Sequence, residues 1–186
     1  MIRRIGSLTL AALLAAAPAG AQDASLFGLF RSVCVAGLEP GGVAARASAQ
    51  GFAPAKKTPK MGDMQDVKAF EKTVGERQFT VVAGRSQGKP RDGMPASTTL
   101  ACGVAVKGKD EAGLAAARKW AAVPVSKSLM GVTFHAWRQG GGRTGIDFDD
   151  KAATKAALLA GDLNVLTSTA LGGSTLLMLS KSRPAG

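Results

Sequence analysis

One histidine and two cysteines are the only side chains of these types in the 186-residue chain, and they limit the chemistry it can perform. Any mechanism that needs an imidazole as general base has to use His135, together with a Ser or Asp that the sequence does not identify. A zinc site built mainly from His and Cys is nearly excluded, because we expect both cysteines to be oxidised and one imidazole then remains. The sequence therefore predicts no metal site and no cofactor.

Three other patterns resemble functional motifs but lack the context that the chemistry needs. Residues 140–145 match the dinucleotide pattern G-x-G-x-x-G, yet the residues that follow read as a strand, whereas a pyrophosphate needs a helix N-terminus there. Ser86 and Lys89 have the spacing of the nucleophile pair of penicillin-recognising enzymes, without the other motifs of those enzymes. Three aspartates within residues 147–150 could hold a hard cation, but no loop with further oxygen ligands accompanies them, so helix capping is the simpler interpretation.

The first residues predict export. Arg3 and Arg4 precede an apolar segment, residues 8–17, that is too short to span a bilayer comfortably, and small residues at 18–21 supply a cleavage pattern. We place the cut after Ala21, so that residues 1–21 are a cleaved signal peptide and the mature protein is periplasmic or secreted. No later stretch is long and apolar enough to cross a membrane.

Cys34 and Cys102 each lie inside an apolar run, residues 26–35 and 99–106. In the oxidising compartment that export implies, two lone cysteines usually pair, so we predict a disulfide that ties an N-terminal helix to a central strand. Two free buried thiols are the alternative. A redox-active pair is disfavoured, because the Cys-x-x-Cys spacing is absent.

The chain is basic, with 24 Lys and Arg against 13 Asp and Glu. Removal of the signal peptide takes away two arginines and leaves 22 basic against 13 acidic residues, a formal balance of +9. Export removes most nucleic acid from reach, so anionic lipid, lipopolysaccharide or cell-wall polymer are the natural counter-surfaces. Scattered basic residues also fit a charge that only maintains solubility. Residues 53–62 read as an exposed basic loop that contains Lys56, Lys57 and Lys60.

Hydrophobic periodicity and turn residues place the elements along the mature chain. Helical spacing predicts helices over 25–37 and 40–51 and a short helix from about 63 to 74. Asp110 caps a helix of about three turns, and Asp149 or Asp150 caps an Ala-rich helix that ends near residue 159. Strands are predicted over residues 78–84, 97–107, 129–138, 144–148, 163–171 and 174–182, the last two joined by the turn Gly172-Gly173.

The predicted strand at 129–138 presents two different faces, because successive side chains alternate. Val132 and Phe134 belong to an apolar row, while Thr133, His135 and Trp137 share the opposite face. We expect the apolar row to be covered, which leaves Thr133, His135 and Trp137 on the reachable face.

Together these elements predict a single α+β domain over residues 22–186. Hairpins join most of the strands, so the sheet should be mainly antiparallel, with about five to six strands. The N-terminal helices and one intervening helix should pack on one face, held there by the single disulfide. The signal peptide, the apolar helix near Cys34, the second cysteine in the strand 100–106 and the closing hairpin resemble a diffuse group of small exported two-cysteine bacterial proteins, proteobacterial in type. Their function is unknown, so the resemblance implies no activity for any residue.

Two main classes of function remain. The preferred class is a non-catalytic periplasmic binding or interaction module, with an anionic envelope component as its partner. The alternative is a small hydrolase-type enzyme that uses His135 as general base. An accessory subunit of an envelope complex is a third possibility. The candidate binding residues are Thr133, His135 and Trp137 on the sheet and Lys56, Lys57 and Lys60 in the basic loop.

Overall fold

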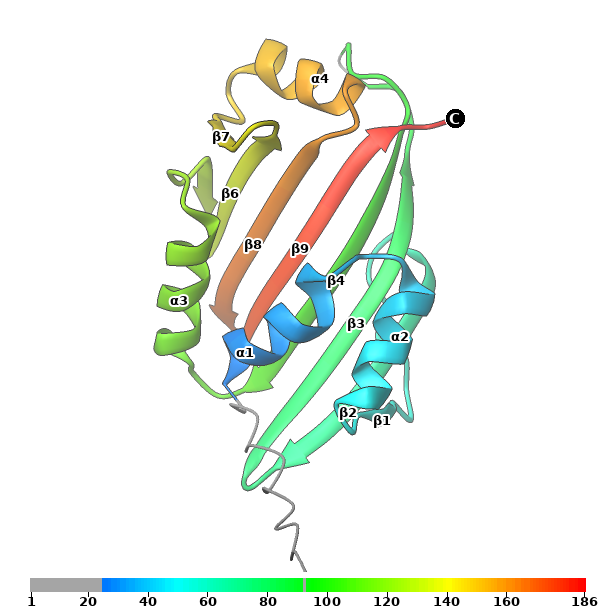
Figure 1. Cartoon of the computed structure of the whole chain (residues 1–186), viewed down its shortest axis with the longest axis vertical. Coiled ribbons are helices and arrows are strands. Elements are labelled where there is room, and N and C mark those ends of the chain that lie inside the picture. Colours follow the sequence, from blue (N-terminus) through cyan, green and yellow to red (C-terminus); the bar gives the residue numbers. More distant parts are fainter. Residues whose placement is uncertain (1–24, 92) are drawn as a thin grey trace, which may run out of the picture.

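The computed structural model describes residues 25–91 and 93–186. The signal peptide predicted for residues 1–21 lies outside the described residues. Within them, the chain forms one antiparallel sheet with helices packed on it (Figure 1). None of the helices in this part of the chain has the length and hydropathy of a membrane span.

The sheet has nine strands in the described part of the chain, and all of its pairings are antiparallel. Their order is β1-β2-β3-β4-β9-β8-β6-β5, and β7 also pairs with β6. The strands are β1 (Ala53–Pro54), β2 (Gln65–Val74), β3 (Arg77–Gly88), β4 (Ser97–Lys107), β5 (Lys127–Leu129), β6 (Val132–Gln139), β7 (Arg143–Ile146), β8 (Leu163–Leu171) and β9 (Ser174–Pro184). The predicted α+β class and antiparallel sheet are confirmed, but five to six strands was too low a number. The sequence prediction lacked β1 and β2 and read β5 and β6 as one strand.

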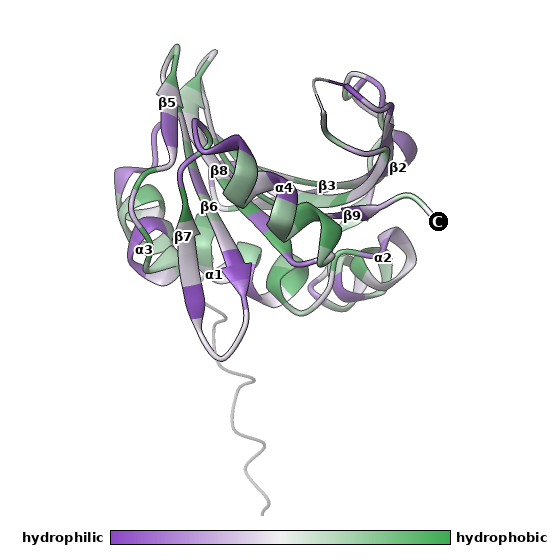
Figure 2. Ribbon diagram, turned by 90° about the horizontal axis from the view of Figure 1, so that it is seen from above, coloured by the Kyte–Doolittle hydropathy of each residue, from purple (hydrophilic) through white to green (hydrophobic). Residues whose placement is uncertain are grey.

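Three helical segments cover one face of the sheet, and a fourth lies on the other face at one end (Figures 1 and 2). The helices are α1 (Leu26–Phe30), which continues as the π-helical turn η1 (Arg31–Val35), α2 (Pro40–Ala49), α3 (Glu111–Ala121) and α4 (Lys151–Leu159). Ser25 caps α1, where its Oγ accepts the Gly28 N–H at 3.0 Å, and the predicted cap Asp150 accepts the Ala153 N–H through Oδ1 at 2.9 Å. Helix ends thus follow local side-chain chemistry.

Residues 65–74 form strand β2, so the short helix predicted for this segment is wrong. Val74 pairs with Arg77, and the two residues between them make a tight turn in which Gly75 has a φ of +58°. Phe70 pairs with Val81 of β3 and is buried. The backbone hydrogen bonds to β3 outweigh the weak helical spacing of the apolar residues, and the tight turn between two β-branched runs was the local signal for a hairpin.

The main core lies between the sheet and helices α1, α2 and α3. Phe30, Phe79 and Leu177 are among its fully buried side chains. The predicted disulfide is confirmed: Cys34 in η1 is bonded to Cys102 in β4, with the two Cα atoms 5.4 Å apart and both residues buried. It fixes the N-terminal helices to the middle of the sheet.

Asp110 joins three elements at the base of this core. Its carboxylate caps α3 by accepting the Gly113 N–H at 2.7 Å, pairs with Arg77 of β3, and accepts a backbone N–H from Leu26 of α1. Burial by itself raises the pKa of Asp110, but the hydrogen bonds from Gly113, Arg77 and Leu26 and the charge of Arg77 outweigh it. The net pKa therefore lies below its ordinary value of 3.8.

We expect Asp110→Asn to lower the free energy of unfolding by about 1 kcal/mol at neutral pH, because the amide keeps the cap but loses the ion pair. A lowered native pKa stabilises the fold above the unfolded pKa, and this contribution disappears as the pH falls through the lower native value. Urea unfolding between pH 7 and pH 2 should therefore show the two proteins converging in stability at the acid end. A difference that stays constant with pH would contradict the role of the charge.

Candidate functional site

The structure places Thr133, His135 and Trp137 on the same face of β6, as predicted, but this is the face that the helices cover. His135 is 3% exposed and Trp137 is 2% exposed. The Trp137 ring packs edge-on against Trp120 of α3, with their centroids 5.9 Å apart. The expectation that His135 and Trp137 are reachable is therefore wrong, while Thr133 is half-buried on the same face. Alternation separates the two faces of a strand, but it does not say which of them a helix will cover.

Arg143 of β7 adds to this cover. Its guanidinium carbon lies 4.2 Å from the centroid of the Trp120 ring and 5.0 Å from that of Trp137. The same group donates hydrogen bonds to the backbone carbonyls of Trp120 and Ala121 at the end of α3. Burial lowers the pKa of Arg143, but an arginine remains charged at neutral pH. This contact closes the helix-covered side of β6 and makes it part of the core.

The His135 side chain is hydrogen-bonded to backbone carbonyls and not to a nucleophile. Its Nδ1 lies 3.0 Å from the Val123 carbonyl and 3.2 Å from the Pro124 carbonyl, so it acts as the donor to one or both. Its Nε2 is buried without a hydrogen-bond partner in the described part of the chain. Neither nitrogen is hydrogen-bonded to a hydroxyl or a carboxylate of the described residues. A hydrolase needs that pairing, so the geometry gives the enzyme hypothesis no support.

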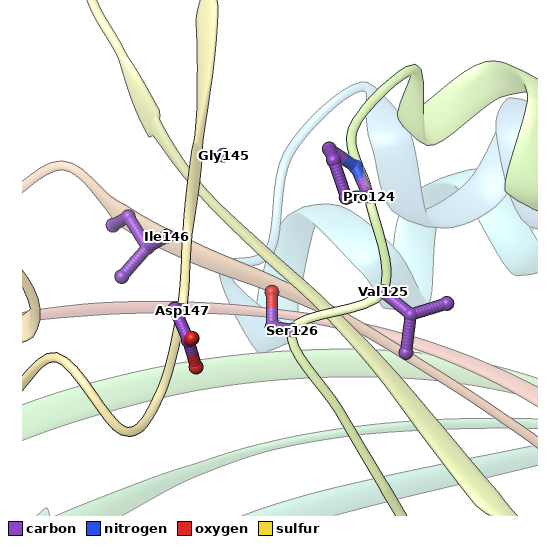
Figure 3. A pocket seen from close by; sticks show the side chains of 6 residues that line it. All are labelled: Pro124, Val125, Ser126, Gly145, Ile146 and Asp147. Carbon is purple, nitrogen blue, oxygen red and sulfur yellow. The ribbon is translucent and has the colours of Figure 1, made fainter.

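A small hollow of about 340 Å³ lies at the edge of β6, where the neighbouring strand changes from β5 to β7. His135 does not line it, but Pro124, whose carbonyl lies 3.2 Å from His135 Nδ1, does. Figure 3 shows Pro124, Val125 and Ser126 on one side of it and β7 with Asp147 on the other. Ser126 Oγ accepts the Ala136 N–H at 2.7 Å, and Asp147 Oδ1 accepts the Asp149 N–H at 2.9 Å. Both polar groups are thus engaged in local structure. No cluster of His, Cys, Asp and Glu that could hold a metal ion is found among the described residues.

The basic loop lies at the other side of the sheet from β6, so the structure does not bring the two groups of candidate residues together. Lys56, Lys57 and Lys60 are exposed in the connection between β1 and β2. This connection ends at Met64, whose Cε atom is only 2.8 Å from where a Cβ on Gly84 would be. Met64 therefore packs on the sheet face that points away from α1, α2 and α3.

That face is the feature sequence reasoning missed. We call it the open face and define it by two rows of residues that are paired across the strands. The first row consists of Ala69, Val82, Gly103, Met178, Thr167, Phe134 and Lys127. The second row consists of Glu71, Thr80, Ala105, Leu176, Thr169, Val132 and Leu129. In each row the charged residue stands at an outer strand, and the interior is apolar or carries hydroxyl groups.

No helix of the described chain lies over the middle of the open face. Figure 2 shows α1, α2 and α3 on the opposite side, and Figure 1 shows α4 at one end of the strands. The residues that α4 contacts belong to a small separate core around Ala136, Leu158 and Leu163. In the first row Ala69, Val82, Gly103 and Thr167 are buried, and the Phe134 ring packs against Phe148 with the centroids 6.1 Å apart. The residues of the second row from Glu71 to Val132 are all only partly buried. The open face therefore carries side chains of core type, and its second row is open to solvent along its whole length.

The open face is continuous across its centre because Gly103 of β4 has no side chain. A Cβ on Gly103 would lie 3.3 Å from both Leu176 Cδ1 and Met178 Cβ of β9, so these two side chains extend over the glycine. Next to the second row is a hollow of about 400 Å³, lined by Thr80, Ala105 and Lys107 together with the β8–β9 turn. The lining of this hollow is mainly polar, with Gln78, Thr80 and Ser174 beside Lys107, whereas Ala105 and Leu176 of the second row next to it are apolar. The hollow and the row together are suited to a molecule with an anionic and an apolar part.

At one end the open face runs into two neighbouring hairpin turns that expose apolar side chains. Leu129 is 58% exposed, Met130 85% and Leu171 50%, and we call these three residues the tip patch. The two turns are fastened together: Thr169 Oγ1 donates to the Gly131 carbonyl at 3.2 Å, and a Cβ on Gly131 would lie 3.2 Å from Leu171 Cδ2. The tip patch is thus an ordered part of the molecule.

Met130 occupies a turn position that favours asparagine or glycine. Leu129 pairs with Val132, and the two residues between them have φ values of +51° for Met130 and +79° for Gly131. We expect Met130→Asn to raise the free energy of unfolding by about 0.5–1 kcal/mol, because Asn-Gly is preferred in such two-residue turns and Met is not. Thermal unfolding of both proteins measures the difference. A clear loss of stability in the variant would show that the Met130 side chain is needed by the fold.

No protein-family model matches the chain, and neither the curated proteins nor the solved structures that were compared with it include a match. The functional assignment therefore rests on the geometry of the open face.

Proposed function

We propose that the protein is a non-catalytic binding module that holds the apolar chain of an anionic amphipathic molecule on the open face of its sheet. The observation that carries the proposal is the pair of cross-strand rows, which place apolar and hydroxyl side chains on a face that the helices leave uncovered. An uncovered apolar face of this kind marks a site of interaction. The partner class is the anionic envelope component expected from the basic sequence.

The dimensions of the open face fit an extended chain. The partly exposed second row crosses six strands from Glu71 on β2 to Val132 on β6, which at the usual strand spacing is about 24 Å. Threonine hydroxyls at 80, 167 and 169 are small enough to leave the floor smooth. A flexible acyl-type chain can lie along such a row with little loss of contact, whereas a flat rigid ring system would touch only part of the curved sheet shown in Figure 2.

The charges around the open face fit an anionic head group. Lys107 lines the hollow beside the second row, and Lys127 ends the first row, where it forms a 3.1 Å ion pair with Asp149. The exposed lysines at 56, 57 and 60 precede Met64, which packs on the same face. The acidic residue within the two rows is Glu71, on β2 next to the sheet edge. A negatively charged head at the Lys107 end would therefore meet favourable charge.

Export to the periplasm or beyond is part of the proposal. It is supported by the signal-peptide pattern of residues 1–21 and by the Cys34–Cys102 disulfide, since disulfides persist in oxidising compartments. Envelope lipids and their single-chain derivatives are the amphipathic anions available there.

The test is the binding of a fluorescent fatty-acid analogue to the purified mature protein below the critical micelle concentration of the probe. We expect saturable binding that lysophosphatidylglycerol displaces, and native mass spectrometry of the mixture should show a discrete protein–lipid species. Absence of saturable binding, with the protein folded and its disulfide intact, would overturn the proposal. A stable dimer that buries the open face and excludes the probe would assign this face to self-association instead.

A further inference from the structure

Met130 and Leu171 of the tip patch lie outside the two rows of the open face, and Leu129 ends the second row; the patch exposes these three large apolar side chains on ordered turns. We propose that the tip patch docks the protein on an anionic lipid bilayer by inserting Leu129, Met130 and Leu171 into the interfacial region. This proposal goes beyond the proposed function and stands on separate observations. It does not require that any ligand lies on the open face.

The first argument is the shape of the patch. Leu129 and Met130 lie at the end of the β5–β6 hairpin and Leu171 at the end of the β8–β9 hairpin, and Figure 2 shows the two hairpin ends near β5 projecting beyond the sheet. A stable protein–protein interface uses roughly 20–30 residues on each side, far more than a patch of three side chains can offer. Three apolar side chains on projecting turns are instead sufficient to enter the boundary between head groups and acyl chains.

The second argument is the backbone of Met130. A methionine with a φ of +51° is less favourable than asparagine or glycine in the same turn, and its side chain is 85% exposed. The fold gains little from a large apolar side chain in this place. An unfavourable backbone position with an exposed apolar side chain points to a contact outside the molecule.

The third argument is the surroundings of the patch. Lys107 and Lys109 are exposed beside the β8–β9 turn, where the Gly108 N–H donates to the Gly173 carbonyl at 2.7 Å, and Lys127 precedes Leu129 on β5. The amines of Lys107 and Lys109 can reach the phosphates of an anionic surface while the neighbouring apolar side chains enter it, and Lys127 can do so by leaving its exposed ion pair with Asp149. Glu111 and Glu76 lie at the same end of the sheet, so apolar insertion, and not charge alone, has to supply the affinity.

The patch is also continuous with the open face. Leu129 pairs with Val132, and Leu171 follows Thr169 on the same face of β8, so apolar side chains extend from the tip to the centre of the sheet. A molecule leaving the bilayer at the tip would meet the open face next, without crossing a charged barrier.

The experiment is flotation of the mature protein with vesicles of phosphatidylethanolamine and phosphatidylglycerol. We expect Met130→Asn and Leu171→Asn each to reduce vesicle partitioning about tenfold, since each removes most of one inserted apolar side chain. Leu159→Asn is the matched control, because Leu159 is 53% exposed on α4 at the opposite end of the sheet. It should partition like the wild type. Met130→Asn keeps a favourable turn, so a loss of binding in this variant is not a loss of folding.

Two results would overturn the proposal directly: no partitioning of the wild type, or equal partitioning of the two tip variants and the wild type. A third is vesicle binding that disappears fully in 0.5 M salt. Such salt screens exposed charges beyond about 4–5 Å, so that binding would be electrostatic only. Binding of the soluble fatty-acid probe is measured on the same proteins without vesicles. If the wild type binds the probe but does not bind vesicles, the proposal for the tip patch fails and the proposed function stands. Loss of probe binding in the wild type is instead a failure of the proposed function.

Discussion

Replacing both cysteines by alanine is expected to lower the free energy of unfolding by about 4 kcal/mol. Cys34 and Cys102 are separated by 68 positions in the sequence, and in the chain-entropy model a crosslink over a loop of this size removes about that much freedom from the unfolded chain. This is a large fraction of the stability of a typical domain. Urea unfolding of Cys34→Ala/Cys102→Ala against the wild type measures the change.

Two controls separate the crosslink from the small cavity that the alanines leave. Wild-type protein that is reduced and kept reduced should unfold at nearly the same urea concentration as the double variant. Before reduction, labelling of the denatured wild type should detect no free thiol. If the double variant lies within 1 kcal/mol of the oxidised protein, the disulfide does not hold the N-terminal helices in the way the structure indicates.

The second large effect concerns the open face. Met178→Glu should weaken binding of the fatty-acid probe at least 100-fold, because Met178 lies at the centre of the first row and a carboxylate there would be desolvated under an apolar chain. The wild-type side chain is only partly buried and is not part of the helix-covered core, so the variant should still fold. Fluorescence titration of both proteins measures the ratio of dissociation constants.

Met178→Leu and Val125→Glu are the matched controls for this prediction. Leucine conserves volume and apolar character, so its binding should stay within a few-fold of the wild type. Val125 is 52% exposed and lines the hollow beside His135, so a glutamate there tests whether that hollow is the binding site. If Val125→Glu abolishes binding and Met178→Glu does not, the ligand lies beside His135 and the open-face assignment fails.

Features decided within a few residues were predictable from the sequence. Asp110 and Asp150 cap their helices as expected. The Gly172-Gly173 turn forms the predicted hairpin, with Leu166 opposite Leu179 and Thr169 opposite Leu176. The cysteine pairing was predictable because the chain contains only two cysteines.

Features decided between distant segments were not predictable. The open face exists because β9 pairs with β8 and with β4, whose paired residues lie 67 to 87 positions earlier in the chain. No local pattern fixes the register Gly103–Met178–Thr167. The wrong expectation that His135 and Trp137 are reachable has the same origin. Trp137 is covered because Trp120 and Arg143, from two other elements, pack on it. The basic loop was predicted as exposed, but its place near Met64 and the open face required the fold of β2.

The most direct test of the central claim is an NMR titration of methyl-labelled protein with lysophosphatidylglycerol. We predict that the methyl resonances of Val82, Leu176 and Met178 shift in a saturable manner, while those of Val125, beside His135, remain in place. Saturable shifts confined to Val125 and its neighbours, or no shifts on the open face at ligand concentrations well above those that saturate the fluorescent probe, would contradict the assignment of the open face as the binding site.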